Sequence, residues 1–218
     1  MELIRSEITS GRLAPGTLVS ASQLAERIGV SRTPVRDALL QLEQAGMVRI
    51  EKNRGATILQ TSLDDLLEVF QLRLMLEVPA AGQAARVRSA EQMREIRACF
   101  DAMHDAVDDP ERLLILDRDL HTSIAAASGG RRLVALLTDL RNLVLTRGVG
   151  TTSTARTGRE LVEDHRGLVL ALEEQDAEAA SAEMRRHVKN TAQLLILQEA
   201  AGDPEYDAER VRQQLAWL

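Results

Sequence analysis

Four side chains in the second half of the sequence could bind one metal ion. Asp117 and His121 lie four residues apart, so both project from the same face of a predicted helix. His165 follows His121 by 44 residues and His187 follows by another 22, each inside its own predicted helix. Three imidazoles and one carboxylate suit zinc, nickel, manganese or iron without any thiolate. On spacing alone, a helical histidine is more often a surface or hydrogen-bonded core residue than a ligand.

The same four groups could instead activate water, as in a metal-dependent hydrolase or lyase. The sequence shows no general base beside them. Glu163 and Asp164 precede His165, but adjacent helix positions do not share its face. His104 fits no part of the pattern and is predicted to lie at the surface. Cys99 is the only cysteine, which excludes an internal disulfide, and we predict a small core residue there.

A second group, in the first sixty residues, has chemistry suited to DNA. Arg32 and Arg36 lie at the start of a predicted helix, where an arginine can donate two hydrogen bonds to guanine. Thr33 and the first free amides of that helix suit a phosphate. Arg54 and Gly55 follow in a polar turn, where Arg54 could reach the minor groove or a phosphate and glycine allows close backbone approach.

The distribution of charge supports a nucleic-acid partner for the first part of the chain only. The 218 residues carry a net charge of -6, but residues 1–60 carry +2 and the remainder -8. Five of the eight basic residues in the first sixty fall between Arg32 and Arg54. This local excess of cations is what phosphates require.

The elements that position the DNA-binding candidates are short. Residues 1–10 form a predicted helix that ends at Gly11, and Ser22 is predicted to cap a second helix that ends at Gly29. Ser31 is predicted to cap a third helix. Two short helices joined by a glycine turn form a helix-turn-helix. Alternating strands over 47–51 and 56–59 then form a β-wing.

The elements that position the metal-binding candidates are almost all helical. The predicted helices cover residues 64–88, 90–107, 111–127, 131–147, 156–174 and 177–200. Short joins favour an all-α antiparallel bundle, and with only 2% aromatic residues its core must be built from Leu, Ala, Val and Ile. No stretch approaches the roughly 20 apolar residues that span a bilayer, so we expect no membrane partner and a cytoplasmic protein.

The first sixty residues resemble the DNA-binding domain of the GntR family. The resemblance rests on Ile8–Gly16 (ITSGRLAPG), Leu24–Ala25, Ile28–Leu39 (IGVSRTPVRDAL), Leu42–Glu43, Gly46 and Arg54–Gly55. It implies a homodimer on a short palindromic operator, with Arg32, Arg36 and Gly55 in contact roles. Because the chain begins almost inside the first helix, an upstream lead-in could be missing.

The second half resembles the FCD ligand-binding domain of the FadR-like GntR subgroup. Its Asp-x-x-x-His, His and His pattern matches Asp117, His121, His165 and His187. The resemblance implies six or seven helices around a divalent metal, with zinc the first candidate and nickel, manganese or iron the alternatives. Water or a small organic acid effector would complete the metal's ligand shell.

Three further residues are candidates for binding the effector. Leu72–Glu77 matches the subgroup's first-helix signature, which implies that Arg73 lies near the ligand pocket and binds an effector carboxylate. The local alternative is an ion pair between Arg73 and Glu77, four residues later. Arg141 and Asn142 are further candidates for the same pocket.

We therefore predict a mainly α protein with a winged helix-turn-helix over 1–60, a metal- and effector-binding bundle over 61–202, and an extension over 203–218. The extension either packs on a dimer partner or is a frayed tail. The predicted function is a transcriptional repressor, not an enzyme, released from its operator by a carboxylate effector at the metal. The alternatives are a regulator for which the metal is itself the signal and, behind it, the hydrolase or lyase.

Overall fold

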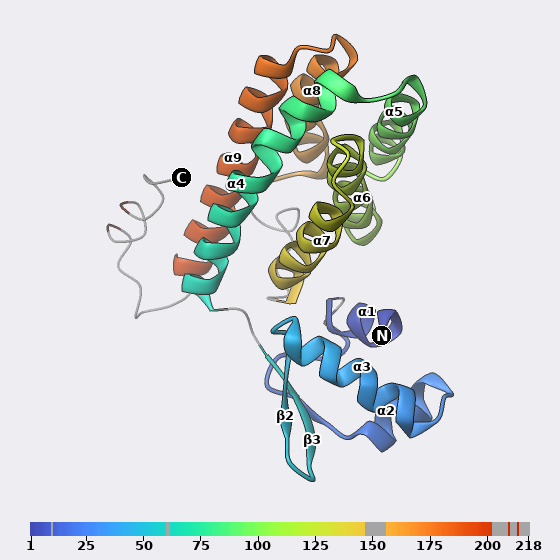
Figure 1. Ribbon diagram of the computed structural model, residues 1–218. Coiled ribbons are helices and arrows are strands. Elements are labelled where there is room, and N and C mark those ends of the chain that lie inside the picture. The colour runs from blue at the N-terminus through green and yellow to red at the C-terminus, as the bar shows by residue number, and fades with distance from the viewer. Residues whose placement is uncertain (10, 60–61, 147–155, 202–208, 210–212, 214–218) are drawn as a thin grey trace. The chain divides into compact units, whose positions relative to one another are not determined.

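The computed structural model describes residues 1–9, 11–59, 62–146, 156–201, 209 and 213. Two compact units are present: Met1–Ser62 with Asn142–Val149, and Leu63–Arg141 with Gly150–Leu218. Apart from residues 209 and 213, the predicted extension over 203–218 lies outside the described residues. Figure 1 shows the helices and strands of both units.

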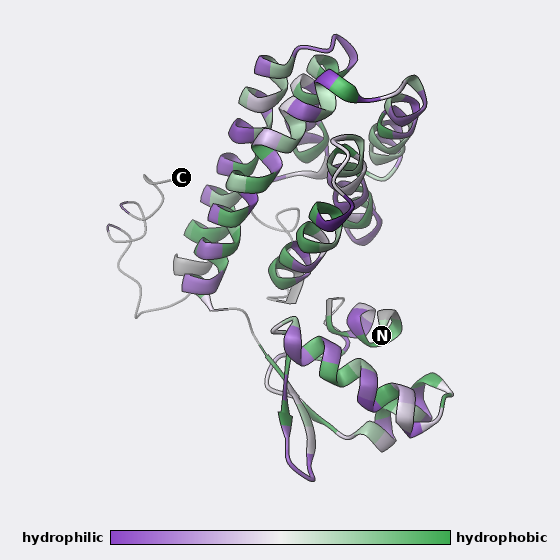
Figure 2. Ribbon diagram, in the orientation of Figure 1, coloured by the Kyte–Doolittle hydropathy of each residue, from purple (hydrophilic) through white to green (hydrophobic). Residues whose placement is uncertain are grey.

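The N-terminal unit is a winged helix-turn-helix, as predicted. Its elements are α1 (Glu2–Thr9), β1 (Leu18–Val19), α2 (Ala21–Ile28), α3 (Arg32–Gln44), β2 (Val48–Glu51) and β3 (Gly55–Ile58). The three strands form an antiparallel sheet in the order β1-β3-β2, with Leu18 opposite Thr57 and Glu51 opposite Gly55. The turn of the wing between β2 and β3 is hydrophilic (Figure 2).

The cap of α2 differs from the prediction. Ser20, not Ser22, is the N-cap, and its hydroxyl accepts a hydrogen bond from the backbone amide of Gln23. The Gln23 side chain in turn accepts from the Ser20 amide, which completes a capping box. A cap at Ser22 would place Ala25 at the reciprocal position, where no side chain can return the bond. Ser22 therefore lies inside the helix.

Gly55 is required by the sheet itself. Its φ is +133°, a conformation that other residues rarely adopt. A Cβ atom at this position would lie 2.1 Å from the carbonyl oxygen of Val19 in β1. The close approach of β1 to β3 therefore excludes any side chain at position 55.

The core of the N-terminal unit collects apolar side chains from nearly every element. Its most buried members, each at most 2% exposed, are Ile4, Ile8, Leu24, Val35, Leu42, Met47, Val48, Ala56 and Ile58. Complete burial of one Ile, Leu or Met side chain stabilises the folded state by about 1.5–3 kcal/mol. This shared core holds together helices that are too short to be stable alone.

The described residues after Ser62 contain six long helices, and every boundary lies within three residues of the prediction; the last turn of α7, from Asn142 on, belongs to the first unit. They are α4 (Leu63–Val87), α5 (Ala90–His104), α6 (Pro110–Ala127), α7 (Arg131–Thr146), α8 (Gly158–Glu173) and α9 (Ala177–Ala201). Capping boxes begin α5 at Ser89 and α8 at Thr157. Asp109 caps α6, with Pro110 in its first turn.

Helices α4 and α9 run side by side along the bundle (Figure 1). The absence of a side chain at Gly82 permits close approach of the two helices at this point. A Cβ atom at Gly82 would lie 2.3 Å from the Ser181 hydroxyl oxygen on α9. Among the described residues, no helix is long and apolar enough to cross a membrane.

Candidate metal centre and DNA-binding groove

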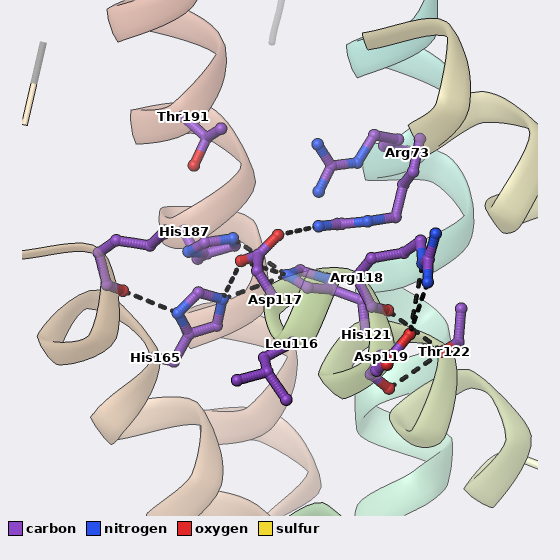
Figure 3. Close-up of polar contacts among 12 residues, drawn as sticks. Arg73, Leu116, Asp117, Arg118, Asp119, His121, Thr122, His165, His187 and Thr191 are labelled. Atoms are coloured by element: carbon purple, nitrogen blue, oxygen red, sulfur yellow. Dashed lines mark hydrogen bonds and ion pairs between the residues drawn. The ribbon is translucent and has the colours of Figure 1, made fainter. Parts of the chain in front are cut away.

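The four predicted metal ligands meet in the interior of the bundle (Figure 3). Asp117 and His121 come from α6, His165 from α8 and His187 from α9, and their ligand atoms all lie within 4.8 Å of one another. His121 Nε2 is 3.2 Å from Nε2 of both His165 and His187. Asp117 Oδ1 is 3.1 Å from His165 Nε2. All four residues are buried.

The other ring nitrogen of each histidine is held by an oxygen. His165 Nδ1 donates to the Leu161 carbonyl at 2.8 Å, and His187 Nδ1 donates to Asp164 Oδ2 at 2.8 Å. His121 Nδ1 donates to Glu77 Oε2 through a short contact. A carbonyl and an ionised carboxylate can only accept, so each Nδ1 carries a proton. The Nε2 lone pairs of the neutral rings therefore point toward one place.

Burial and neighbouring charges favour neutral rings for His121 and His187 and ionised carboxylates for Asp117 and Glu77. Burial, and then Arg141, lowers the pKa of His121 to about 4, and burial likewise lowers the pKa of His187. Burial alone would raise the pKa of Asp117, but the Arg141 guanidinium and the neighbouring His165 and His121 together outweigh it, and the pKa falls well below its usual range. At neutral pH Asp117, His121 and His187 are therefore in the protonation state that metal binding needs.

The arrangement fits a divalent cation. Nitrogens about 2.1 Å from one cation are about 3.0–3.4 Å apart at octahedral to tetrahedral angles, and the observed separation is 3.2 Å. Asp117 Oδ1 is buried without a hydrogen-bond partner among the described residues. Converging lone pairs and an ionised oxygen repel one another unless a positive charge lies between them. The donor set therefore suits a metal better than an empty polar cavity.

Two carboxylates that orient the ligands were missed in the sequence. Glu77 Oε2 holds His121, and Asp164 holds His187, although Asp164 was set aside because it does not share a face with His165. Asp164 also accepts from Arg156 Nη1 at 3.3 Å and from Arg186. Such outer carboxylates fix the tautomer and ring orientation of metal-binding histidines. A search for acidic residues on neighbouring helices could have suggested them, but not identified the pairing.

Arg73 and Arg141 both lie at the metal centre. Arg73 Nε donates to Glu77 Oε1 at 2.6 Å, which is the ion pair considered as the local alternative, and Arg141 donates to Asp117 through a short contact. The Arg73 guanidinium also lies 5.1 Å from the centre of the Phe70 ring. Buried N–H groups remain on Arg73 Nη2 and on Arg141 Nε and Nη1 that have no hydrogen-bond partner among the described residues.

Three further residues singled out in this half are not among the four candidate ligands. Asn142 is 1% exposed, and neither atom of its amide has a hydrogen-bond partner within the described ranges. His104 is exposed and packs edge-on against Phe100, with ring centres 4.9 Å apart. Cys99 is partly buried, which raises the pKa of its thiol to about 11 and leaves it a poor nucleophile.

The five predicted DNA-contacting residues line one groove of about 760 Å³ between α3 and the wing. Arg32, Thr33 and Arg36 are exposed on the first turns of α3, and Arg54 and Gly55 lie at the wing. Four cationic and two acidic side chains line this groove. The Arg54 side chain is 68% exposed and pairs with Glu51 at 2.8 Å.

The first turn of α3 keeps its amides available. Ser31 is the N-cap residue but, in the described part of the chain, its side chain makes no capping hydrogen bond, in contrast to Ser20 at the start of α2. Uncapped amides at a helix N-terminus attract anions such as phosphate. Of the two helices of the helix-turn-helix, α3 is therefore the one whose N-terminal amides are left without a side-chain cap in the described part of the chain.

Both halves of the chain match known protein families. Residues 1–58 match the bacterial regulatory proteins of the gntR family, and residues 68–190, more than half of the chain, match the FCD domain. The chain belongs to the GntR family. In the sequence of this GntR regulator, an FCD domain follows the DNA-binding domain. Proteins of the family bind DNA operators and regulate transcription. The chain is not an enzyme, which removes the hydrolase or lyase alternative.

Curated relatives and solved structures agree with this assignment. This GntR regulator is 29% identical over 189 residues to the "Probable D-xylose utilization operon transcriptional repressor" of Paenarthrobacter nicotinovorans, covering 86% of this chain and 83% of that protein. It is 27% identical to the HTH-type transcriptional regulator LutR of Bacillus subtilis, covering 86% and 95%. Escherichia coli McbR/YncC has a similar fold, with a TM-score of 0.80, 22% identity and coverage of 91% and 95%.

Proposed function

We propose that this GntR regulator is a metabolite-responsive repressor: a small carboxylate effector binds beside a divalent metal and releases the operator. The carrying observation is the convergence of three Nε2 atoms and Asp117 beside two buried arginines with unpaired N–H groups. One relative, which this chain covers over 83% of its length, is named a probable transcriptional repressor, and this supports repression over activation.

Asp117, His121, His165 and His187 would hold the metal, with zinc the first candidate and nickel, manganese or iron as alternatives. The bound ion would supply a Lewis-acidic centre with room for an oxygen ligand of the effector. The chain's own contribution is to fix the three ring tautomers through Glu77, Leu161 and Asp164.

The charge of the site favours an anionic effector. Arg73 and Arg141 balance Glu77 and Asp117, so a divalent cation leaves the buried cluster with an excess of positive charge. An effector carboxylate would offset this excess of positive charge and accept hydrogen bonds from the N–H groups of both arginines that have no hydrogen-bond partner among the described residues. Asn142 belongs to the same proposal as a further effector contact, supported by its unpaired amide.

At the other end of the chain, Arg32 and Arg36 would contact base edges, and Thr33 would contact a phosphate. Arg54 would reach the minor groove or the backbone from the wing, and Gly55 would let the backbone come close. A palindromic operator calls for a homodimer with twofold symmetry. Leu72 and Met75, 38% and 57% exposed on α4, offer apolar surface for such a dimer. A DNA-binding role places the protein in the cytoplasm.

The test begins with the metal content of the purified protein, measured by elemental mass spectrometry. An operator is then selected from random duplexes, and its affinity is measured by fluorescence anisotropy while carboxylates such as acetate, lactate and succinate are added. We expect a carboxylate to weaken operator binding in the metal-loaded protein and not in Arg73→Met. If no carboxylate changes operator affinity in any metal-loaded sample, the effector part of the proposal is wrong.

The second candidate is a regulator for which the metal is itself the signal, supported by ligands that are already ionised or neutral as binding requires. Chelation separates the two. A metal sensor changes operator affinity when zinc is removed and restored without any carboxylate. In an effector-responsive regulator, removal of zinc abolishes the carboxylate response and leaves operator affinity unchanged.

A further inference from the structure

Glu77 connects helix α4 to the metal centre, although none of the four candidate ligands lies on α4. Its carboxylate is 2% exposed, and both oxygens are engaged. Oε1 accepts from Arg73 Nε at 2.6 Å, and Oε2 accepts from His121 Nδ1. One buried carboxylate thus joins a side chain of α4 to a metal ligand on α6.

The position of α4 in the chain gives this contact its importance. The helix begins at Leu63, five residues after β3 of the wing ends at Ile58, and continues for 25 residues to Val87. It packs most extensively against α9, which carries His187, and also against α6. Helix α4 is therefore the first helix that follows the DNA-binding domain in the sequence.

We infer that Glu77 is a positioning residue through which metal occupancy orders α4. The inference rests on the metal centre proposed above. A cation on His121 Nε2 makes the Nδ1–H group a stronger donor, and a charge-assisted bond to Glu77 is strengthened in turn. Since Glu77 is a residue of α4 and is held in place by its ion pair with Arg73, the bond between Glu77 and His121 connects the helix to the ion.

Asp164 provides a matched comparison. It holds His187 as Glu77 holds His121, at 2.8 Å from Nδ1, but it belongs to α8, and it also accepts from Arg156, Arg186 and Asn190. Loss of either carboxylate should loosen one histidine. Only the loss of Glu77 should release α4.

The experiment is hydrogen exchange of the full chain, with and without saturating Zn²⁺, read by mass spectrometry of peptides. In the unmodified protein, zinc should slow exchange in α4, α6, α8 and α9. Glu77→Gln and Asp164→Asn should each weaken zinc affinity by about 10–100-fold. At saturating zinc, the slowing of hydrogen exchange in α4 by zinc should be about tenfold smaller in Glu77→Gln than in the unmodified protein, while the slowing in α8 and α9 is kept. In Asp164→Asn, the slowing of exchange in α4 should be kept.

Glu77→Asp is the second variant, because it keeps a negative charge on α4 beside Arg73 and shortens the reach of the carboxylate to His121. It gives the answer if Glu77→Gln fails to fold, as judged by circular dichroism. If zinc still slows exchange in α4 in zinc-saturated Glu77→Gln or Glu77→Asp, the proposed role of Glu77 is wrong. The proposed metal centre is not affected by that result. Failure of the unmodified protein to bind zinc, nickel, manganese or iron overturns both.

Discussion

The DNA-binding groove and the metal centre use arginines in opposite surroundings. In the groove, the Arg54 side chain is 68% exposed and pairs with Glu51 on the same wing. In the metal centre, the side chains of Arg73 and Arg141 are 3% and 8% exposed and pair with buried carboxylates. Water and salt screen the first kind of charge but not the second. Substitution of an exposed arginine in the groove should therefore change binding alone, whereas substitution of an arginine in the metal centre should also change folding.

The largest expected effect comes from Arg141→Met. The variant leaves Asp117 buried without its cation, and the free energy of unfolding of the metal-free protein should fall by about 3–5 kcal/mol. Urea titration followed by circular dichroism measures it. Arg54→Met is the matched control and should shift the same quantity by less than about 0.5 kcal/mol. Equal effects of the two substitutions would remove the contrast.

Acidification should destabilise the metal-free protein through the same buried cluster. The pKa of His121 is about 4 in the folded protein and about 6.5 when unfolded, so the unfolded chain binds the proton first. Stability present above pH 6.5 should decline as the pH falls toward 4, by up to about 3 kcal/mol from this group. Urea titrations at several pH values test this, and His121→Gln should flatten the profile. An unchanged profile in that variant would contradict the assignment.

Metal binding should stabilise the second unit by mass action. Zinc at 100 times its Kd should raise the free energy of unfolding by about 2.7 kcal/mol, and His165→Asn should abolish the gain. Thermal melting with and without zinc measures the effect. His104→Asn changes an exposed histidine outside the cluster and should keep the full stabilisation. A gain that survives in His165→Asn would place the ion elsewhere.

In the groove, Arg32→Ala should weaken operator binding by about 1–3 kcal/mol without changing the melting temperature. Because a guanidinium that contacts a base edge reads sequence, the variant should also relax the preference at one base pair in each half-site. Anisotropy titrations against single-base operator variants measure both effects, and Arg36→Ala is the parallel case. Uniform weakening across all sequences would make Arg32 a phosphate contact instead.

Arg54→Ala should give the smallest effect. A wing side chain that neutralises one phosphate contributes about one unit to the slope of log affinity against log salt concentration. The variant should bind operator and random DNA more weakly by similar factors, with the slope reduced by about 1. Binding measured at several salt concentrations shows whether the slope changes. An unaltered slope would place Arg54 away from the DNA.

The sequence predicts the six helices after Ser62 well because several of them begin at capping residues that can be recognised from nearby sequence alone. Two capping boxes, each formed by residues three positions apart, begin α5 (Ser89 and Gln92) and α8 (Thr157 and Glu160). The same local rule fails for α2, where Ser20 and Ser22 can both cap. The choice depends on Gln23 standing three positions after Ser20, which the prediction did not weigh.

The outer contacts of the metal centre are harder to predict because they depend on how helices are rotated against one another. Glu77 and His121 are 44 residues apart, and Asp164 and His187 are 23 apart. Four-residue spacing within α6 predicted that Asp117 and His121 share a face. No spacing rule says which carboxylate of α4 or α8 faces the far nitrogen of each ring.

The glycine of the wing affects how mutational scans of this protein should be interpreted. A methyl group at position 55 would collide with the Val19 carbonyl, so Gly55→Ala should disrupt the pairing of β1 with β3 before any DNA is added. A scan scored only by promoter activity would therefore rank position 55 beside Arg32, even if its backbone never touched a nucleotide. Soluble protein yield recorded for each variant would separate the two causes.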